Sequence, residues 1–173
     1  MIKQFFLFLC CCIITSTGFS QKPWELGGEY QRLYGQGYSG NRMGVRYESF
    51  SNKSSWSLGL TYNFSTKKSY SVSKGFGVYA GYRYGFSNSP NGNPFAGLRA
   101  YLSFESFEGK ANVNGMTITP VAEAGYHFIS GKHLFASPAL GFGYCIRLTH
   151  ENNSLQEDEG IRFIPGIAAG FRF

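Results

Sequence analysis

The stretch SWSLGLTYNF, Ser55 to Phe64, decides the fold, because its polar and apolar residues alternate without a fault. One face carries a row of aromatic and aliphatic side chains, and the opposite face carries only small or polar ones. Strict alternation of this kind is typical of a β-strand with one apolar face. The apolar row consists of Trp56, Leu58, Leu60, Tyr62 and Phe64.

The same period of two returns along the rest of the chain. It is clear in residues 75–86, 95–107, 118–128, 136–148 and 161–173, and weaker in 42–50 and 25–34. Within 25–34, Arg32 falls on the face of Tyr30 and Leu33 falls opposite, so we expect a β-bulge near Arg32 to restore the register. The sequence therefore predicts an all-β domain of about eight antiparallel strands.

Composition, hydropathy and the distribution of charge argue against two other classes of protein, helical membrane proteins and nucleic-acid-binding proteins. Only 15% of the residues are charged, against about 25% in an average soluble chain. After residue 20 no apolar run approaches the roughly 20 residues that a membrane helix needs, which excludes a helical membrane protein. The formal net charge is +6, but Lys and Arg form no run, so nucleic acid is not expected as a partner.

Residues 1–20 predict a cleaved signal peptide, followed by one domain over residues 21–173. Lys3 precedes an apolar stretch from Phe5 to Ile14, and small residues lead up to Ser20. This pattern places the cleavage between Ser20 and Gln21 and predicts an exported protein.

A lipoprotein signal is the alternative for the same segment, with Cys10, Cys11 or Cys12 as the lipidated residue. That processing favours a small residue just before the cysteine, which argues against it here. After removal of the signal peptide Cys145 would be the one cysteine left, so no internal disulfide is expected.

The apolar face is zoned along each strand. Aromatic residues gather near the strand ends and smaller aliphatic residues occupy the middle, as at the two interfaces and the hydrocarbon zone of a membrane. The opposite face mixes small residues with arginines and carboxylates, which suits a crowded interior. We therefore expect the apolar face to look outward at lipid. The predicted aromatic girdles comprise Trp56, Phe64, Phe76, Phe86, Phe95, Phe104, Phe128, Phe135, Phe163 and Phe173.

Strands in lipid must close on themselves, because every backbone polar group needs a partner within the sheet. The sequence thus predicts a transmembrane up-and-down β-barrel. With both termini on the periplasmic side, the longer connections are the outer loops. These are expected at residues 35–41, 65–74, 108–116 and 149–160, and the inner turns at 51–54, 87–94 and 129–133.

A signal peptide, about eight alternating strands and a terminal aromatic residue resemble the small outer-membrane barrels of the OmpA and OmpX type. The segments VYAGYRYGF (78–86), PVAEAGYHF (120–128) and SPALGFGY (137–144) are also similar to small uncharacterised barrels of Bacteroidota. The resemblance implies the fold and a bacterial outer-membrane location. It leaves the activity open, because these families include adhesins, scaffolds, accessory subunits and enzymes on one framework.

An eight-stranded barrel has an interior just wide enough for side chains to fill, and the alternation sends many charged residues into it. Buried charges are tolerated only when they are paired, which predicts an ion-pair plug; a selective ion path is the alternative. The predicted interior network consists of Arg83, Arg99, Glu105, Glu123, Arg147, Arg162 and Arg172, together with Arg42, Arg46 and Glu48.

Two groups of residues are candidates for catalysis. Glu123 and His127 lie four apart on one inward face and could perform acid–base chemistry, but no Ser or Cys nucleophile accompanies them in sequence, so a structural histidine is expected. His150, Ser154 and Glu157 lie in an outer loop at the leaflet that holds lipopolysaccharide. Some outer-membrane barrels of this size hydrolyse or transfer the acyl chains of lipopolysaccharide, but the His-Ser motif of the deacylases among them is absent here. We therefore expect a solvated loop without catalytic residues.

No metal site and no cofactor are expected. The three histidines, His127, His133 and His150, fall on different segments, which does not match the spacing of a metal cluster. Cys145 is alone on an inward face and is expected to fill interior space.

The sequence thus predicts an integral outer-membrane barrel with a structural, adhesive or accessory-subunit role through its outer loops or its lipid-facing wall. A narrow pore and a lipopolysaccharide-modifying acyl hydrolase or transferase are the alternatives. The basic stretch 65–74 and the acidic stretch 155–160 would suit electrostatic contact with lipopolysaccharide, with an envelope protein partner, or with each other.

The chain ends GIAAGFRF, with Ile167, Ala169, Phe171 and Phe173 on the apolar face. This pattern resembles the C-terminal signal by which bacterial outer-membrane barrels are delivered to their assembly machinery. That machinery and outer-membrane lipid are therefore expected partners.

Changing Phe173 to Asp, or extending the chain beyond Phe173, is expected to impair assembly because either change removes the terminal aromatic residue from the signal. The measurement is the fraction of membrane-extracted protein whose gel mobility shifts on boiling, as a folded barrel's does. Normal insertion of both variants would contradict this role.

Overall fold

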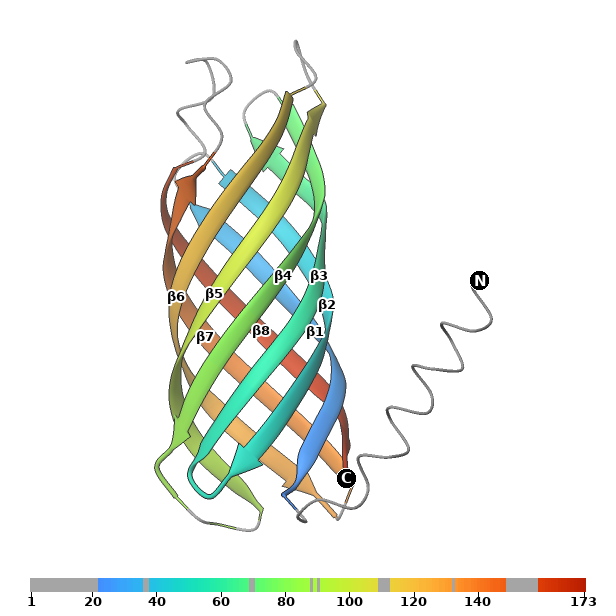
Figure 1. Cartoon of the computed structure of the whole chain (residues 1–173), viewed down its shortest axis with the longest axis vertical. Helices are drawn as coiled ribbons and strands as arrows, with labels where there is room; N and C mark the ends of the chain where they lie inside the picture. Colours follow the sequence, from blue (N-terminus) through green and yellow to red (C-terminus); the bar gives the residue numbers. More distant parts are fainter. Residues whose placement is uncertain are drawn as a thin grey trace, which may run out of the picture.

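The computed structural model describes residues 22–35, 38–68, 71–87, 89, 91–108, 113–131, 133–148 and 159–173. Each strand pairs antiparallel with the next, and the eighth pairs with the first, so the sheet closes into a barrel (Figure 1). The predicted fold class is confirmed. The strands are β1 (Trp24–Gly35), β2 (Tyr38–Ser51), β3 (Ser54–Lys68), β4 (Ser71–Gly85), β5 (Gly92–Glu108), β6 (Val113–Ser130), β7 (Leu134–Arg147) and β8 (Gly160–Arg172).

The two ends of the described chain lie at the same end of the barrel (Figure 1), which we call the inner end. The opposite, outer end carries the connections from β1 to β2, β3 to β4, β5 to β6 and β7 to β8. At 17 and 18 residues, β5 and β6 exceed the roughly 9–11 residues of a membrane-crossing strand. They reach furthest at the outer end (Figure 1).

Several predicted connections are shorter than the sequence indicates. Strand β3 continues to Lys68, β4 begins at Ser71 and β6 begins at Val113, so parts of the predicted outer loops 65–74 and 108–116 are strand. The predicted signal peptide, the cleavage between Ser20 and Gln21, and residues 149–158 lie outside the described residues.

The predicted bulge near Arg32 is wrong. Strand β1 pairs with β2 in one register from Trp24↔Ser49 to Gly35↔Tyr38. Leu33 simply points inward, and Arg32 lies on the outside, where its Nη1 donates to Asn41 Oδ1 at 2.8 Å. The register shifts lie elsewhere, in β2–β3 between Ser39 and Arg42 and in β3–β4 between Asn63 and Thr66.

Apolar and polar side chains are arranged in the reverse of a soluble domain. Large apolar residues cover the outside, with Leu60 67% and Phe76 71% exposed, whereas Arg46 and Glu25 are fully buried inside. A contiguous apolar wall of this extent marks a surface that is covered in its working state. The alternation of each strand therefore separates an apolar exterior from a charged interior.

Two residues of the predicted aromatic girdles lie inside the barrel instead. Phe95 and Phe135 are buried, because their positions share the parity of the inward residues of β5 and β7. The Arg83 guanidinium carbon lies 4.2 Å from the Phe95 ring centroid, and that of Arg46 lies 5.0 Å from the Phe135 ring. These rings act as cation–π partners of buried arginines.

Glycine on the inward face makes room for large interior side chains. The Tyr79 ring lies where a Cβ on Gly59 would stand, and the Arg162 side chain occupies the corresponding space beside Gly35. A larger residue at either position would collide with that side chain, so these glycines let neighbouring strands share a narrow lumen.

Three prolines interrupt the hydrogen-bond ladders, because proline has no backbone N–H to donate. Pro120 in β6 and Pro138 in β7 both face the β6–β7 seam, where pairing stops between Ile118↔Ile146 and Val121↔Gly143 and again between Gly125↔Ala139 and Phe128↔Ala136. Pro165 interrupts the β8–β1 seam in the same way. By contrast, β5 and β6 pair without a gap from Gly92↔Phe128 to Phe107↔Val113.

We expect backbone amides along the β6–β7 seam to exchange with solvent deuterium faster than those along the β5–β6 seam, because local opening starts where the ladder is incomplete. Hydrogen exchange of the folded barrel in detergent measures this. The variant Pro138→Ala restores an N–H toward β6 and should slow exchange near residue 126. Equal protection of the two seams in the unmodified protein would contradict this prediction.

Candidate functional site

The barrel interior brings together most of the charged residues that the strands point inward. They form two groups along the barrel axis. The inner cluster is defined as Arg46, Arg83, Arg99 and Arg172 with Glu25, Glu29, Glu48 and Glu123. The outer cluster is defined as Arg42, Arg147, Arg162 and Glu105, with the polar residues Asn63, Thr117 and Thr119.

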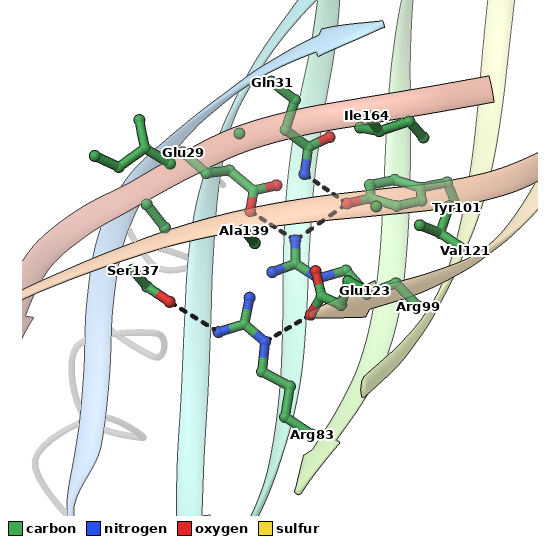
Figure 2. Close-up of a pocket in the computed structure, with 14 residues that line it drawn as sticks. Glu29, Gln31, Arg83, Arg99, Tyr101, Val121, Glu123, Ser137, Ala139 and Ile164 are labelled. Carbon is green, nitrogen blue, oxygen red and sulfur yellow. Dashed lines mark hydrogen bonds and ion pairs between the residues drawn. The ribbon is translucent and has the colours of Figure 1, made fainter. Parts of the chain in front are cut away.

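Glu123 is the carboxylate that joins two arginines of the inner cluster. Its Oε1 accepts from Arg83 Nε at 2.6 Å, and its Oε2 lies 2.9 Å from Arg99 Nε. Figure 2 shows both guanidinium groups converging on it from β4 and β5. Arg99 also donates from Nη1 to Glu29 Oε2 at 3.0 Å. Each guanidinium thus spans two carboxylates that lie far apart in the sequence.

A second branch of the inner cluster runs to the inner end of the barrel. Glu48 Oε2 lies 3.2 Å from Arg83 Nη1 and 3.1 Å from Arg46 Nη2. Arg46 Nη2 also lies 3.4 Å from Glu25 Oε2. The Oε1 atom of Glu25 lies 2.9 Å from His127 Nε2 and 3.7 Å from Arg172 Nη1. Glu25, on the first strand, therefore meets cationic or imidazole groups from β2, β6 and β8.

Two tyrosines cross the lumen at the top of the inner cluster. The Tyr79 hydroxyl donates to Glu29 Oε2 at 3.0 Å. The Tyr101 hydroxyl accepts from Gln31 Nε2 at 2.7 Å and from Arg99 Nη1 at 3.1 Å (Figure 2). Above them Leu33, Val121 and Ile164 complete a buried apolar layer. This layer separates the inner cluster from the outer cluster.

The outer cluster is built around Arg42 and Glu105. Arg42 Nε donates to Asn63 Oδ1 at 2.8 Å, and Asn63 Nδ2 donates to Glu105 Oε1 at 2.6 Å. Cys145 lies in the same compartment and is buried and reduced.

Two small cavities lie between these described side chains, and each has a volume of about 20 Å³. A space of this size holds one water molecule. The first, drawn in Figure 2, lies among Glu29, Gln31, Arg99 and Tyr101. The second lies in the outer cluster. Side chains fill the lumen between them, as the width of an eight-stranded barrel requires.

The residues predicted for the interior network are all placed on the inward face. Arg42, Arg46, Glu48, Arg83, Arg99, Glu105, Glu123 and Arg162 are buried, and Arg147 and Arg172 are half-buried toward the two ends. Glu25, Glu29 and Gln31 were missed, because the uncertain register of residues 25–34 hid their direction. Their strict spacing of two and four residues within β1 is the signal that could have found them.

Glu123 and His127 do not form a catalytic pair in the structure. Glu123 is bound by Arg83 and Arg99, whereas His127 faces Glu25 and lies between the rings of Phe50 and Phe135, with centroids 5.5 and 5.6 Å away. His150, Ser154 and Glu157 lie outside the described residues. Within the described residues no group of three His, Cys, Asp or Glu side chains is placed to hold a metal ion.

The predicted assembly signal occupies the closing strand. Ile167, Ala169, Phe171 and Phe173 lie on the outer face, and the Phe173 ring stacks on Trp24 of β1 with centroids 4.2 Å apart. The last residue therefore contacts the first strand where the barrel closes.

Comparison with known proteins identifies the fold. No protein-family model and no curated protein sequence matches the chain. Among solved structures, the chain is similar to Neisserial surface protein A, with a TM-score of 0.61, 14% identity, and 88% of this chain and 96% of that one covered. It is also similar to Ail, the attachment invasion locus protein of Yersinia pestis, with a TM-score of 0.55, 14% identity, and 89% and 100% covered. This likeness shows a shared eight-stranded barrel fold.

The variant Glu123→Gln tests the inner cluster. It leaves two buried guanidinium groups without a shared counter-charge, and we expect a loss of about 3–5 kcal/mol in the free energy of unfolding, as when one partner of a buried ion pair is removed. The measurement is urea unfolding of the barrel in detergent or lipid. Glu159→Gln, at an exposed carboxylate at the rim, is the matched control and should change stability little. Equal effects of the two variants would refute the network.

Proposed function

We propose that the protein is an integral barrel of a bacterial outer membrane that acts through its outer end, as an adhesive or accessory contact surface. The exposed apolar wall supports insertion in lipid, because in water that area would drive association. The similar structures from Neisseria and Yersinia support the outer membrane as the location. Export by a signal peptide and delivery by the assembly machinery belong to the same proposal.

The filled lumen is the observation that carries this proposal. Ion pairs, tyrosines and an apolar layer occupy the interior from Glu25 to Glu105, and the cavities there hold about 20 Å³ each. A passage for hydrated ions or solutes would require many of these partners to separate at once. The outer end and the wall are therefore the surfaces left for interaction.

A lipid-modifying activity has less support. Its interior candidates, Glu123 and His127, are each engaged with other partners, and catalysis needs a nucleophile, a base and an orienting group in mutual contact. The contact role requires only a stable barrel that displays its outer connections. Lipopolysaccharide and an envelope or host protein are the partners that such a display would meet.

The name and one further structure of the Yersinia protein suggest a first ligand to test. Ail is named for attachment and invasion, and its structure has also been solved with the heparin analogue sucrose octasulfate, at 15% identity to this chain and a TM-score of 0.55. For the present protein a sulfated polysaccharide is accordingly a reasonable test ligand, in view of the basic stretch 65–74.

Adhesion of intact cells tests the proposal. Cells that display the protein should adhere to immobilised heparin or to host-cell matrix more than cells without it. A variant with residues 149–158 and 69–70 replaced by short neutral turns, and with Lys67, Lys68 and Lys74 changed to Gln, should lose this gain. Heat-dependent gel mobility of the variant checks that the barrel still folds.

Three outcomes would overturn the proposal. Stable, well-resolved channels from the purified protein in planar bilayers would favour the pore, and release of acyl chains from lipopolysaccharide, lost in His150→Ala, would favour the enzyme. Adhesion unchanged by replacement of the loops would also contradict a contact role for the outer end.

A further inference from the structure

Arg32 places a positive charge on the lipid-facing wall of the barrel. Among the described outward-pointing side chains of β1, β2 and β8 it is the only charged one. Its polar and ring contacts within the described residues are with Asn41 and Tyr34, and no carboxylate is among them. A charge beside hydrocarbon is costly without a counter-charge. The neighbouring side chains on the wall are Tyr30, Tyr34, Met43, Phe163, Pro165 and Ile167.

Arg32 and Asn41 together offer unused hydrogen-bond donors on this wall. Asn41 stands opposite Arg32 in the β1–β2 ladder, and its Oδ1 accepts from the Tyr30 hydroxyl at 2.6 Å and from Arg32 Nη1 at 2.8 Å. These bonds use the acceptor of Asn41 and leave its Nδ2 without a partner among the described residues. Arg32 Nε is buried and also unpaired. The unused groups of both side chains are therefore N–H donors, which suit an anionic acceptor.

The guanidinium group of Arg32 is held in place against the wall. Its carbon atom lies 5.5 Å from the ring centroid of Tyr34, which is two residues nearer the outer end of β1. The Tyr34 ring stacks in turn on Phe163 of β8, with centroids 6.2 Å apart. The bond to Asn41 holds the group from the β2 side. A charged group fixed in this way loses less entropy when it binds a ligand than one that extends freely into water.

Arg32 lies near the outer boundary of the apolar wall. It follows Trp24, whose ring stacks on Phe173 at the inner end, by eight positions in β1. Eight residues of a tilted strand rise about 20 Å along the barrel axis, and the apolar band of such barrels is about 25 Å tall. Because the guanidinium group lies toward the outer end, it reaches the level at which lipid headgroups begin. The phosphates of these headgroups are the anionic groups that the wall meets there.

We propose that Arg32 and Asn41 bind the phosphate group of a lipid in the outer leaflet. A guanidinium group binds two phosphate oxygens through parallel N–H bonds, and Asn41 Nδ2 donates to a further oxygen. A water molecule would accept the free hydrogens but would bring no negative charge. The phosphate belongs either to the lipid A part of lipopolysaccharide or to a glycerophospholipid. The site rests on the proposed insertion in an outer membrane and is independent of the proposed adhesive role.

Native mass spectrometry of the folded, membrane-extracted protein in detergent measures lipid binding. The lipids are lipid A with its phosphates, the same lipid A without them, and phosphatidylglycerol. We expect removal of the phosphates to weaken binding about tenfold, as for the loss of one hydrogen bond between charged groups. Tighter binding of lipid A or of phosphatidylglycerol then identifies the source of the phosphate. Equal binding of lipid A with and without phosphates would overturn the proposal, and displacement of the lipid by excess inorganic phosphate would contradict a lipid as the source.

Three variants with the same change in net charge make the test specific. Arg32→Gln should weaken binding of the phosphorylated lipid about tenfold. Asn41→Asp supplies a carboxylate that pairs with Arg32, should weaken binding as well, and keeps the test decisive if Arg32→Gln does not fold. Lys53→Gln removes an exposed positive charge from the inner turn and should leave binding unchanged. Unchanged binding in the first two variants, or an equal loss in Lys53→Gln, would refute the assignment.

Heat-dependent gel mobility of each protein separates failure of the site from failure of the proposed function. An unmodified protein without this shift would count against the membrane barrel itself. An unmodified protein that shows the shift and supports adhesion, but binds lipid without regard to phosphate, would refute the Arg32 site and leave the proposed function standing.

Discussion

The pairing of β1 with β8 is the constraint on which the rest of the structure depends. It runs from Glu25↔Arg172 to Gly35↔Arg162 and removes the last free edge of the sheet. Only a closed sheet pairs its backbone polar groups without water, so only a closed sheet can carry an apolar outer wall in lipid. Once the barrel is closed, each side chain points either to the wall or to a narrow lumen.

The narrow lumen then determines how the charges are arranged. Residues from opposite sides of the barrel meet across it, so Glu29 on β1 can bind Arg99 on β5. Aromatic rings such as Phe95 cover the guanidinium faces that carboxylates leave open. The same packing leaves only small cavities among the described side chains of the interior, and for this reason the proposed role lies at the outer end.

Alternation along single strands predicted the barrel, but it could not predict which side chains meet across the lumen. Leu33 points into an interior that was expected to be polar, because there it packs with Val121 of β6 and Ile164 of β8. Phe95 and Phe135 were assigned outward from their aromatic character, although their parity is inward. Which glutamate meets which arginine depends on barrel geometry, since Arg99 and Glu29 are 70 residues apart. The gaps in strand pairing at Pro120 and Pro138 could have been predicted from the sequence, because proline has no backbone N–H to donate.

Tryptophan fluorescence in brominated lipid tests the inside-out arrangement most directly. In a Trp24→Phe, Trp56→Phe background, Leu60→Trp places one indole in the middle of the outer wall, at a position that is 67% exposed. Lipids brominated near the centre of their acyl chains should quench it strongly, and aqueous iodide should not. Strong quenching by iodide with none by the brominated lipid would contradict a barrel whose apolar face looks outward at the membrane.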